Sequence, residues 1–342
     1  MSIQATLEKR RKTVLLTVIL LFLAVASAGI ICLFTGSSDM TLSEGLSALF
    51  GQGADTHSRI IFNIRLPRVL AAIIAGAGLS AAGLIMQTVL DNPLAAPSTL
   101  GVADGAVFGA NLSLLVLSSG FFASLFTGFV AFVFATLSAV AILLFCRARA
   151  FSPVTVVLAG LAVGAVFKAG TTILQFYADD VSLSSAVVWS FGDLGRATYE
   201  TDLIMLAVLV VGLCFFVPFM WKYNLLLGGE GSARALGVNV NSLCFISLLL
   251  ASVITAVCVS FLGVIGFVGI ICPHVAKRIF GQDHRITLPV SLLLGSLLLL
   301  LSDTLSRILG GGAALPVGAI TSLFGAPFFI AVIFGKREGK LC

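Results

Sequence analysis

Ten apolar runs, each about 17 to 25 residues long, alternate with short polar segments along most of the chain. A helix of about 20 apolar residues crosses a hydrocarbon core of ~30 Å, so every run is long enough to span a bilayer. The sequence therefore predicts an all-α, polytopic membrane protein with about ten transmembrane helices, forming a single transmembrane domain over residues 1–342. The predicted spans are Val14–Phe34, Val69–Leu90, Leu100–Ser118, Phe121–Phe145, Val154–Tyr177, Leu203–Trp221, Leu243–Leu262, Val264–Phe280, Ile286–Leu305 and Leu315–Phe334.

The composition agrees with a membrane protein and disfavours a soluble one. Hydrophobic residues make up 59% of the chain and charged residues only 10%, which is too little polar surface to enclose a soluble core. The net charge of +5 comes from residues at the ends of apolar runs and not from a basic tract, so no nucleic-acid partner is expected. The seven cysteines are scattered without a C-x-x-C pair and indicate neither a disulfide framework nor a metal knuckle.

The first and the eighth apolar runs are less certain as ordinary spans than the others. The first run follows a basic segment and suits either a signal peptide or a first span, but it continues past the cleavage-like triplet Ala26–Ala28, which favours an uncleaved span. The eighth run contains Pro273 and several charged or titratable residues. We expect it to lie inside the bundle, where protein covers the freed backbone groups.

The distribution of Lys and Arg predicts the topology. With the N-terminus in the cytoplasm, the cytoplasmic segments hold fourteen of these residues and the outer segments five, and Lys168 within a span completes the twenty. The bias supports ten spans with both termini in the cytoplasm. Of the outer segments, we expect Leu42–Phe50 to form a short interfacial helix and Ser182–Trp189 to be helical.

Enzymatic motifs are missing from the sequence. It has no G-x-x-x-x-G-K-[ST], so the chain is not expected to hydrolyse ATP by a P-loop. It also has no H-E-x-x-H, and His57, His274 and His284 are too dispersed to indicate a metal site. We therefore expect no catalytic residue, no metal and no cofactor on this chain.

Residues 224–239 form a polar interruption that the charge distribution places in the cytoplasm. Glu230 and Arg234 are spaced i,i+4 and can support one helical turn, and Leu236-Gly237 is typical of a helix end with a glycine stop. Small residues would let another protein approach the backbone closely, although an ordinary loop between spans explains this stretch equally well. The small residues are Gly229, Gly231, Ser232, Ala233, Ala235 and Gly237.

Polar residues in and near the spans are the remaining candidates. Lys168 lies roughly 13 Å from the outer end of its span at the helical rise, and leaving it in lipid would cost about 2.5 to 3.5 kcal/mol, so it should face a partner group or an aqueous path. Asp104 and Asp303 lie nearer to span ends, where we expect water-accessible or helix-capping roles. Asn92–Pro97 predicts a rigid turn that either closes a pore or only joins two helices.

Three outer arginines, Arg65, Arg68 and Arg307, stand at the ends of spans two and nine. Such residues can form a docking patch for an acidic partner, or they can anchor to lipid headgroups. The sequence leaves both readings open.

Several motifs in order resemble one family. The chain is similar, from about residue 10 to 338, to the FecCD-type permease subunits of iron-siderophore, haem and cobalamin ABC importers, which have the type II importer fold. The motifs are Arg65-Leu-Pro-Arg68, Gln87–Gly101 with Asn92-Pro-Leu-Ala, Leu227–Val238 with Ala235-Leu-Gly, Gly266-Phe-Val-Gly-Ile-Ile-Cys-Pro-His274, Asp283-His-Arg285 and Leu315–Phe328.

The resemblance implies partners and roles. The partners are a second permease subunit, two cytoplasmic ATPases that use ATP and Mg, and an external substrate-binding protein. Arg65, Arg68 and Arg307 would meet acidic residues of the binding protein, Asn92 and Leu94 would lie near the cytoplasmic gate, and Lys168 would lie on a pathway helix. The stretch that would couple to the ATPase comprises Leu227, Gly228, Gly229, Glu230, Ala233, Arg234, Ala235, Leu236 and Gly237.

The sequence thus favours a permease that carries a metal chelate inward by alternating access. A family member usually has a neutral residue where this chain has Lys168. A cation there favours an anionic cargo, such as a ferric siderophore or haem, over neutral cobalamin, which remains the alternative within the family. An ion-coupled secondary transporter is the alternative from another class, and the scarcity of mid-span carboxylates argues against it.

Overall fold

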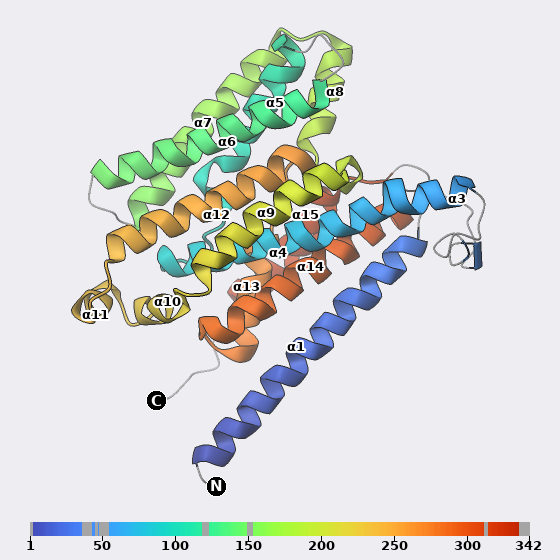
Figure 1. The fold of residues 1–342 in the computed structure, drawn as a ribbon. Helices are drawn as coiled ribbons and strands as arrows, with labels where there is room; N and C mark the ends of the chain where they lie inside the picture. Colours follow the sequence, from blue (N-terminus) through green and yellow to red (C-terminus); the bar gives the residue numbers. More distant parts are fainter. Residues whose placement is uncertain are drawn as a thin grey trace.

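The computed structural model describes residues 3–35, 43–44, 47, 55–117, 123–148, 153–310 and 314–334, which form a bundle of helices (Figure 1). In these residues the only β-type pairing is one isolated parallel bridge between Phe191 and Val264. The prediction of an all-α fold is therefore confirmed. The principal helices are α1 (Ile3–Phe34), α3 (Asp55–Ile60), α4 (Leu66–Val89), α5 (Val102–Leu112), α6 (Ala123–Ala148), α7 (Pro153–Phe176), α8 (Asp180–Ser190), α9 (Tyr199–Phe216), α10 (Met220–Leu226), α11 (Glu230–Ala235), α12 (Val240–Leu262), α13 (Val268–Phe280), α14 (His284–Leu309) and α15 (Val317–Phe334).

Short non-α turns extend or join several of these helices. The π-helical turn η1 (Ile61–Arg65) connects α3 to α4 without a break, and a second π-helical turn, η3 (Ser113–Leu117), extends α5. The 3₁₀ turns η2 (Pro97–Leu100) and η4 (Leu194–Arg196) precede α5 and α9.

Each of the ten predicted spans contains a helix. Among the described residues, seven helices are long and apolar enough to cross a membrane, and two shorter apolar helices, Val102–Leu117 and Val317–Phe328, fall in the third and tenth predicted spans. The eighth predicted span is wrong at its start, because Val264–Phe267 is not helical and α13 begins only at Val268. Gly263 has a φ of 77° and Phe267 a φ of 66°, which explains why the chain leaves the helical path between them.

Helix α4 is the centre of the bundle and the most buried of the long apolar helices that the structure describes. It packs against α14 and α13 through backbone contacts (Figure 1). A Cβ atom added to Gly76 would lie 2.4 Å from the Gly295 carbonyl oxygen, and one added to Gly83 would lie 1.9 Å from the Gly269 oxygen. Because only glycine allows such close approach, α4, α13 and α14 form one tightly packed unit. The expected position of the eighth span inside the bundle is confirmed by the buried residues of α13.

Two expectations concern the segments between spans. The helix expected over Ser182–Trp189 is confirmed by α8, whose first turn is capped by the Asp179 carboxylate, which accepts from the Ser182 backbone N–H at 3.0 Å. The helix expected over Leu42–Phe50 lies almost entirely outside the described residues.

Candidate functional site

Helices α10 and α11 lie at one end of the bundle, beyond the long helices α9 and α12 (Figure 1). The predicted i,i+4 pair is present, since the Arg234 Nη2 donates to the Glu230 Oε2 at 3.2 Å. Arg234 also donates to the Asn241 Oδ1 at 2.9 Å, which ties α11 to the first turn of α12. Both partners of the ion pair are about half exposed, so the pair stabilises the short helix by only about 0.3 to 0.5 kcal/mol.

Helix α11 ends in a Schellman motif. The Gly237 N–H donates to the Arg234 carbonyl and the Val238 N–H to the Ala233 carbonyl, both at 3.0 Å. Gly237 has a φ of 82°, so the predicted glycine stop is confirmed. Ala233 and Val238 are buried beneath this end of the helix. The Ala233 side chain therefore faces the protein interior, and its part in a contact with a partner stays a prediction.

The other residues of this stretch form a continuous exposed surface. We call Leu227–Gly237, without Ala233, the α11 surface; its exposed members include Leu227, Gly228, Gly229, Glu230, Arg234, Ala235, Leu236 and Gly237. Leu236 has 63% of its surface exposed, although leucine is an apolar residue. Leu227 is exposed as well, so the surface presents two large apolar side chains among glycines and charged residues. The role of this surface in coupling stays a prediction.

Helix α10 is fastened to the bundle by two neighbouring residues. The Tyr223 side chain is fully buried, and its hydroxyl lies 2.7 Å from the Ser247 Oγ on α12. Burial raises the pKa of the Tyr223 phenol above its usual value, so the hydroxyl stays protonated and can serve this bond at neutral pH. The Asn224 side chain bonds to Asp283 and His284 at the start of α14. The sequence reasoning did not find this attachment.

The turn after α4 also follows the Schellman pattern, with an aspartate where glycine is usual. Asp91 has a φ of 42°, and the Asn92 N–H donates to the Gln87 carbonyl at 3.1 Å. The Asn92 Oδ1 then accepts from the Leu94 N–H at 2.9 Å. Asn92 therefore holds the turn together, while the Leu94 side chain is 46% exposed. We call residues 90–97 the α4 turn.

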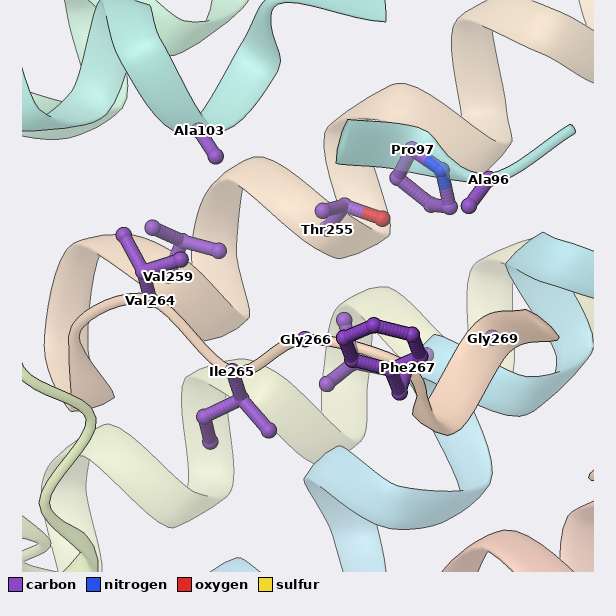
Figure 2. A pocket seen from close by; sticks show the side chains of 11 residues that line it. Ala96, Pro97, Ala103, Thr255, Val259, Val264, Ile265, Gly266, Phe267 and Gly269 are labelled. Atoms are coloured by element: carbon purple, nitrogen blue, oxygen red, sulfur yellow. The ribbon is translucent and has the colours of Figure 1, made fainter. Parts of the chain in front are cut away.

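A small cavity lies beside the α4 turn. Its volume is about 30 Å³, and Figure 2 shows the side chains of Pro97, Thr255 and Phe267 around it. Most of its wall is apolar and comes from α4, α12, the α4 turn and the non-helical stretch before α13. The cavity is large enough for only one or two water molecules, so it is not a binding site for a large cargo.

The three predicted docking arginines lie at the opposite end of the bundle, and all three have partners within the chain. The Arg68 Nε donates to the Asp303 Oδ1 at 2.7 Å, and the Arg307 Nε lies 3.1 Å from the Asp303 Oδ2. Arg65 donates to the Leu33 carbonyl at 2.8 Å and is only 5% exposed. These contacts join α1, η1, α4 and α14, so the first role of the arginines is structural. Binding-protein docking stays a prediction.

Asp303 does not have the role that its position suggested. It is 1% exposed and lies between Arg68 and Arg307, neither accessible to water nor capping a helix. Asp193, in the segment that precedes η4, adds a longer ion pair to the Arg68 Nη2 at 3.7 Å.

Lys168 is exposed on the face of α7 that the described chain leaves uncovered. Asp104 on helix α5 interacts electrostatically with Lys168. A Cβ atom added to Gly164, one turn before Lys168, would lie 2.7 Å from the Asp104 Oδ2, so the carboxylate reaches α7. Asp104 is half-buried. A cation and a carboxylate thus lie near each other on helices that are otherwise mainly apolar.

Comparison with known proteins gives one consistent family. The FecCD transport family matches residues 16–335. The chain is 41% identical to a protein described as an ABC transporter permease of Methanocaldococcus jannaschii, over 92% of this chain and 93% of that protein. It is 36% identical to the permease of an Fe(3+)-citrate import system of Bacillus subtilis, over 96% and 97% of the two chains. A solved inward-facing structure, described as a metal-chelate type ABC transporter, matches with a TM-score of 0.83 and 27% identity, over 94% of this chain and 99% of the other.

Proposed function

The chain belongs to the FecCD transport family, and from this membership we propose that it is the membrane permease of an ATP-driven importer for an anionic ferric chelate. The whole chain, residues 1–342, forms one permease domain. A binding protein delivers the chelate outside, and the permease releases it into the cytoplasm by alternating access. The observation that carries the proposal is the exposed α11 surface on a helix pair fastened to the bundle, because such a surface can receive force from a separate ATPase.

The α11 surface is the contact with the ATPase. Leu236 supplies the apolar part of the contact and Gly228, Gly229 and Gly237 allow close backbone approach. Added Cβ atoms would meet nothing within 4 Å at Gly229 and Gly237, so space outside the chain is open to a partner there. ATP and Mg bind to the partner ATPase, and this chain supplies no hydrolysis.

The arginine cluster attracts the external binding protein by its net charge. Within this cluster Arg65, Arg68 and Arg307 outnumber Asp303 and the half-exposed Asp193 by one positive charge. The internal ion pairs hold these arginines in place. A fixed positive field of this kind steers an acidic partner toward the surface and increases the association rate.

The pathway runs along the exposed face of α7, between this permease and a second one. Lys168 would be costly in lipid at this depth, by about 2.5 to 3.5 kcal/mol, so its exposed side chain favours an aqueous path over lipid. The α4 turn with Asn92 and Leu94 forms the cytoplasmic gate. A carboxylate-bearing chelate such as ferric citrate suits the positive charge of Lys168, and a permease of an Fe(3+)-citrate system is among the similar proteins.

The complete importer is multi-pass in the cytoplasmic membrane of a prokaryote, with both termini of this chain in the cytoplasm. It contains two permease subunits, identical or paralogous, two ATPases and the binding protein. The excess of Lys and Arg in the segments at the α11 end supports this orientation.

Uptake into proteoliposomes tests the function. The permease complex, with its own ATPases and binding protein, is supplied with radiolabelled ferric citrate, haemin or cobalamin, with and without ATP. We expect ATP-dependent uptake of an anionic iron compound that requires all the components. Uptake by the permease alone, driven by an ion gradient, would contradict the proposal and support a secondary transporter.

A further inference from the structure

His284 connects α10 to the end of α4 through the two nitrogens of one buried ring. Its Nδ1 lies 2.8 Å from the Asn224 Oδ1, and its Nε2 lies 2.7 Å from the Thr88 Oγ1. The His284 residue has no exposed surface, and Thr88 is 6% exposed. Asn224 and Thr88 are thus joined through a residue that is itself the first of α14.

The chemistry of the partners fixes the direction of the hydrogen bond between His284 and Asn224. The Asn224 Nδ2 donates to the Asp283 Oδ1 at 2.7 Å, and the Asn224 Oδ1 accepts from the His284 backbone N–H at 2.9 Å. The same oxygen therefore faces Nδ1, and Nδ1 must carry a proton. In a neutral imidazole Nε2 is then an acceptor, and the Thr88 hydroxyl shares its single proton between Nε2 at 2.7 Å and the Leu84 carbonyl oxygen at 3.0 Å.

The surroundings hold the ring in this position. The Tyr223 ring on α10 packs against the imidazole with centroids 5.7 Å apart, and its hydroxyl is bonded to Ser247 on α12. Next to Thr88, the Gln87 side chain donates to the Gly269 and Ile270 carbonyls and accepts from the Lys277 Nζ at 3.2 Å. The last turn of α4 is therefore connected to α13 by Gln87 and to α10 by Thr88 and His284.

The two ends of this connection are the two moving parts of the proposed transport cycle. Helix α10 leads through Leu227–Gly229 into α11, and the backbone bonds Gly228 to Leu225 and Gly229 to Leu226 keep the joint short. At the other end, Thr88 lies in the last turn of α4, directly before the α4 turn. A displacement of α11 thus reaches the α4 turn through a part-buried bond of 2.8 Å and a buried bond of 2.7 Å.

We propose that His284 is a positioning residue that transmits the ATPase-driven movement of α10 and α11 to the gate formed by the α4 turn. The inference rests on the proposed function, in which the α11 surface contacts an ATPase. It assigns a role to the buried Thr88 and His284 and to the partly buried Asn224. A residue that only filled space would not require a donor on one side and an acceptor on the other.

Thr88→Val removes the hydroxyl and keeps the shape of the side chain. The conservative Thr88→Ser keeps the hydroxyl. Thr287→Val is a matched control, because Thr287 is equally buried one turn along α14 and its hydroxyl bonds only to the Asp283 carbonyl of its own helix. All variants are prepared as the full complex with its ATPases. Gate movement is measured by spin labels at two exposed positions, Leu94 in the α4 turn and Leu137 on α6, with and without trapped nucleotide.

In the parent complex we expect the Leu94 to Leu137 distance to change when nucleotide is trapped. Thr88→Val should abolish this change and reduce transport per ATP about three- to tenfold, the effect of one lost hydrogen bond. Thr88→Ser and Thr287→Val should both retain the change. An unaltered gate movement in Thr88→Val would overturn the role of His284. The same result from Thr287→Val as from Thr88→Val would overturn it too, because the effect would then be one of packing.

A cross-linking experiment distinguishes a failure of the proposed role of His284 from a failure of the proposed contact with the ATPase. A photoreactive group at the exposed Leu236 should react with the ATPase in the parent and in Thr88→Val alike. Retained cross-linking with lost gate movement supports the role of His284. Without cross-linking in the parent complex, the proposed contact of the α11 surface is wrong, and the transmission through His284 is overturned with it.

Discussion

The Arg68 guanidinium and the Asp303 carboxylate lie 2.7 Å apart in the structure although 235 positions separate them in the chain. Arg68 is in the first turn of α4 and Asp303 is in the last third of α14, so the pair joins the two helices at one end of the bundle. Both side chains are largely buried, and Arg307 adds a second cation to the same carboxylate. Asp303 is therefore the main counter-charge of the arginine cluster, and Asp193 adds only the longer ion pair to Arg68.

Replacement of Asp303 should therefore destabilise the protein strongly. Asp303→Asn keeps the shape but leaves the buried Arg307 without a counter-charge and Arg68 with only the longer ion pair to Asp193, and we expect a loss of about 3 to 5 kcal/mol. Thermal unfolding of the purified protein in detergent measures it. Glu230→Gln is the control, since it breaks an exposed ion pair and should change stability by less than about 1 kcal/mol. Equal effects of the two substitutions would contradict the structural role of the cluster.

Replacement of Asp202 should have the opposite effect on the stability of the protein. This residue of α9 is 4% exposed, and neither carboxylate oxygen has a hydrogen-bond partner among the described residues. A buried charge without a partner is unfavourable, so Asp202→Asn should leave stability unchanged or raise it, by up to about 1 to 2 kcal/mol. Thermal unfolding of Asp202→Asn and Asp303→Asn in the same detergent compares the loss of a carboxylate without a partner with the loss of one that has ionic partners. A decrease as large as that of Asp303→Asn would show that Asp202 has an essential ionic partner.

Gly83 tests the central helix crossing. Its added Cβ would lie 1.9 Å from the backbone oxygen of Gly269, which cannot move away as a flexible side chain could. Gly83→Ala should therefore cost at least about 1 to 3 kcal/mol and lower the yield of folded protein. Gly231→Ala is the matched control, because nothing lies within 4 Å and the change should stabilise α11 by up to about 1 kcal/mol. Folded yield by size-exclusion chromatography distinguishes them.

Ser232 is the position for testing the α11 surface. Ala233 is buried and Gly229 has a φ of 93°, so large residues at either position would disturb the fold itself. Ser232 is exposed within α11, and Ser232→Trp should leave the unfolding temperature unchanged. It should lower transported cargo per ATP about tenfold, corresponding to about 1.4 kcal/mol of lost contact energy. Coupling that survived this substitution would mean that the ATPase does not contact α11.

Lys168 tests the charge of the cargo. Lys168→Met retains the length of the side chain and removes its charge, and we expect the KM for ferric citrate to rise about tenfold, or about 1.4 kcal/mol. Cobalamin, which lacks the charge, serves as the comparison cargo, and the ATPase activity of the complex should change little. An identical response of both cargoes would place Lys168 outside the pathway.

The sequence predicted the helices well because long apolar runs leave the backbone few alternatives in a membrane. It also predicted the end of α11, since Leu236-Gly237 carries its own local signal. The start of α13 was misplaced by four residues because Val264–Phe267 is as apolar as a helix would be, and the bridge between Phe191 and Val264 is non-local.

The side-chain partners could not be predicted in the same way. Charges at the ends of spans look accessible in a sequence, whereas Arg65, Arg68 and Arg307 use acceptors on distant helices. The Asp303 to Arg307 spacing of i,i+4 was an available signal for one of these pairs. His284 contacts Asn224 and Thr88, which are 60 and 196 positions away in the sequence. The only sequence signal in this segment was the motif Asp283-His-Arg285.

The carbonyl groups at the end of α1 gain their hydrogen-bond donor only late in the synthesis of the chain. Cys32 and Thr35 accept from Arg307, which follows Cys32 by 275 residues. At a synthesis rate of about 5 to 20 residues per second, roughly 14 to 55 s pass between the two. During that time α1 is in the membrane without its hydrogen bonds to Arg307. We therefore expect nascent chains that stop before residue 307 to hold α1 loosely, so that early proteolysis would act on α1 first.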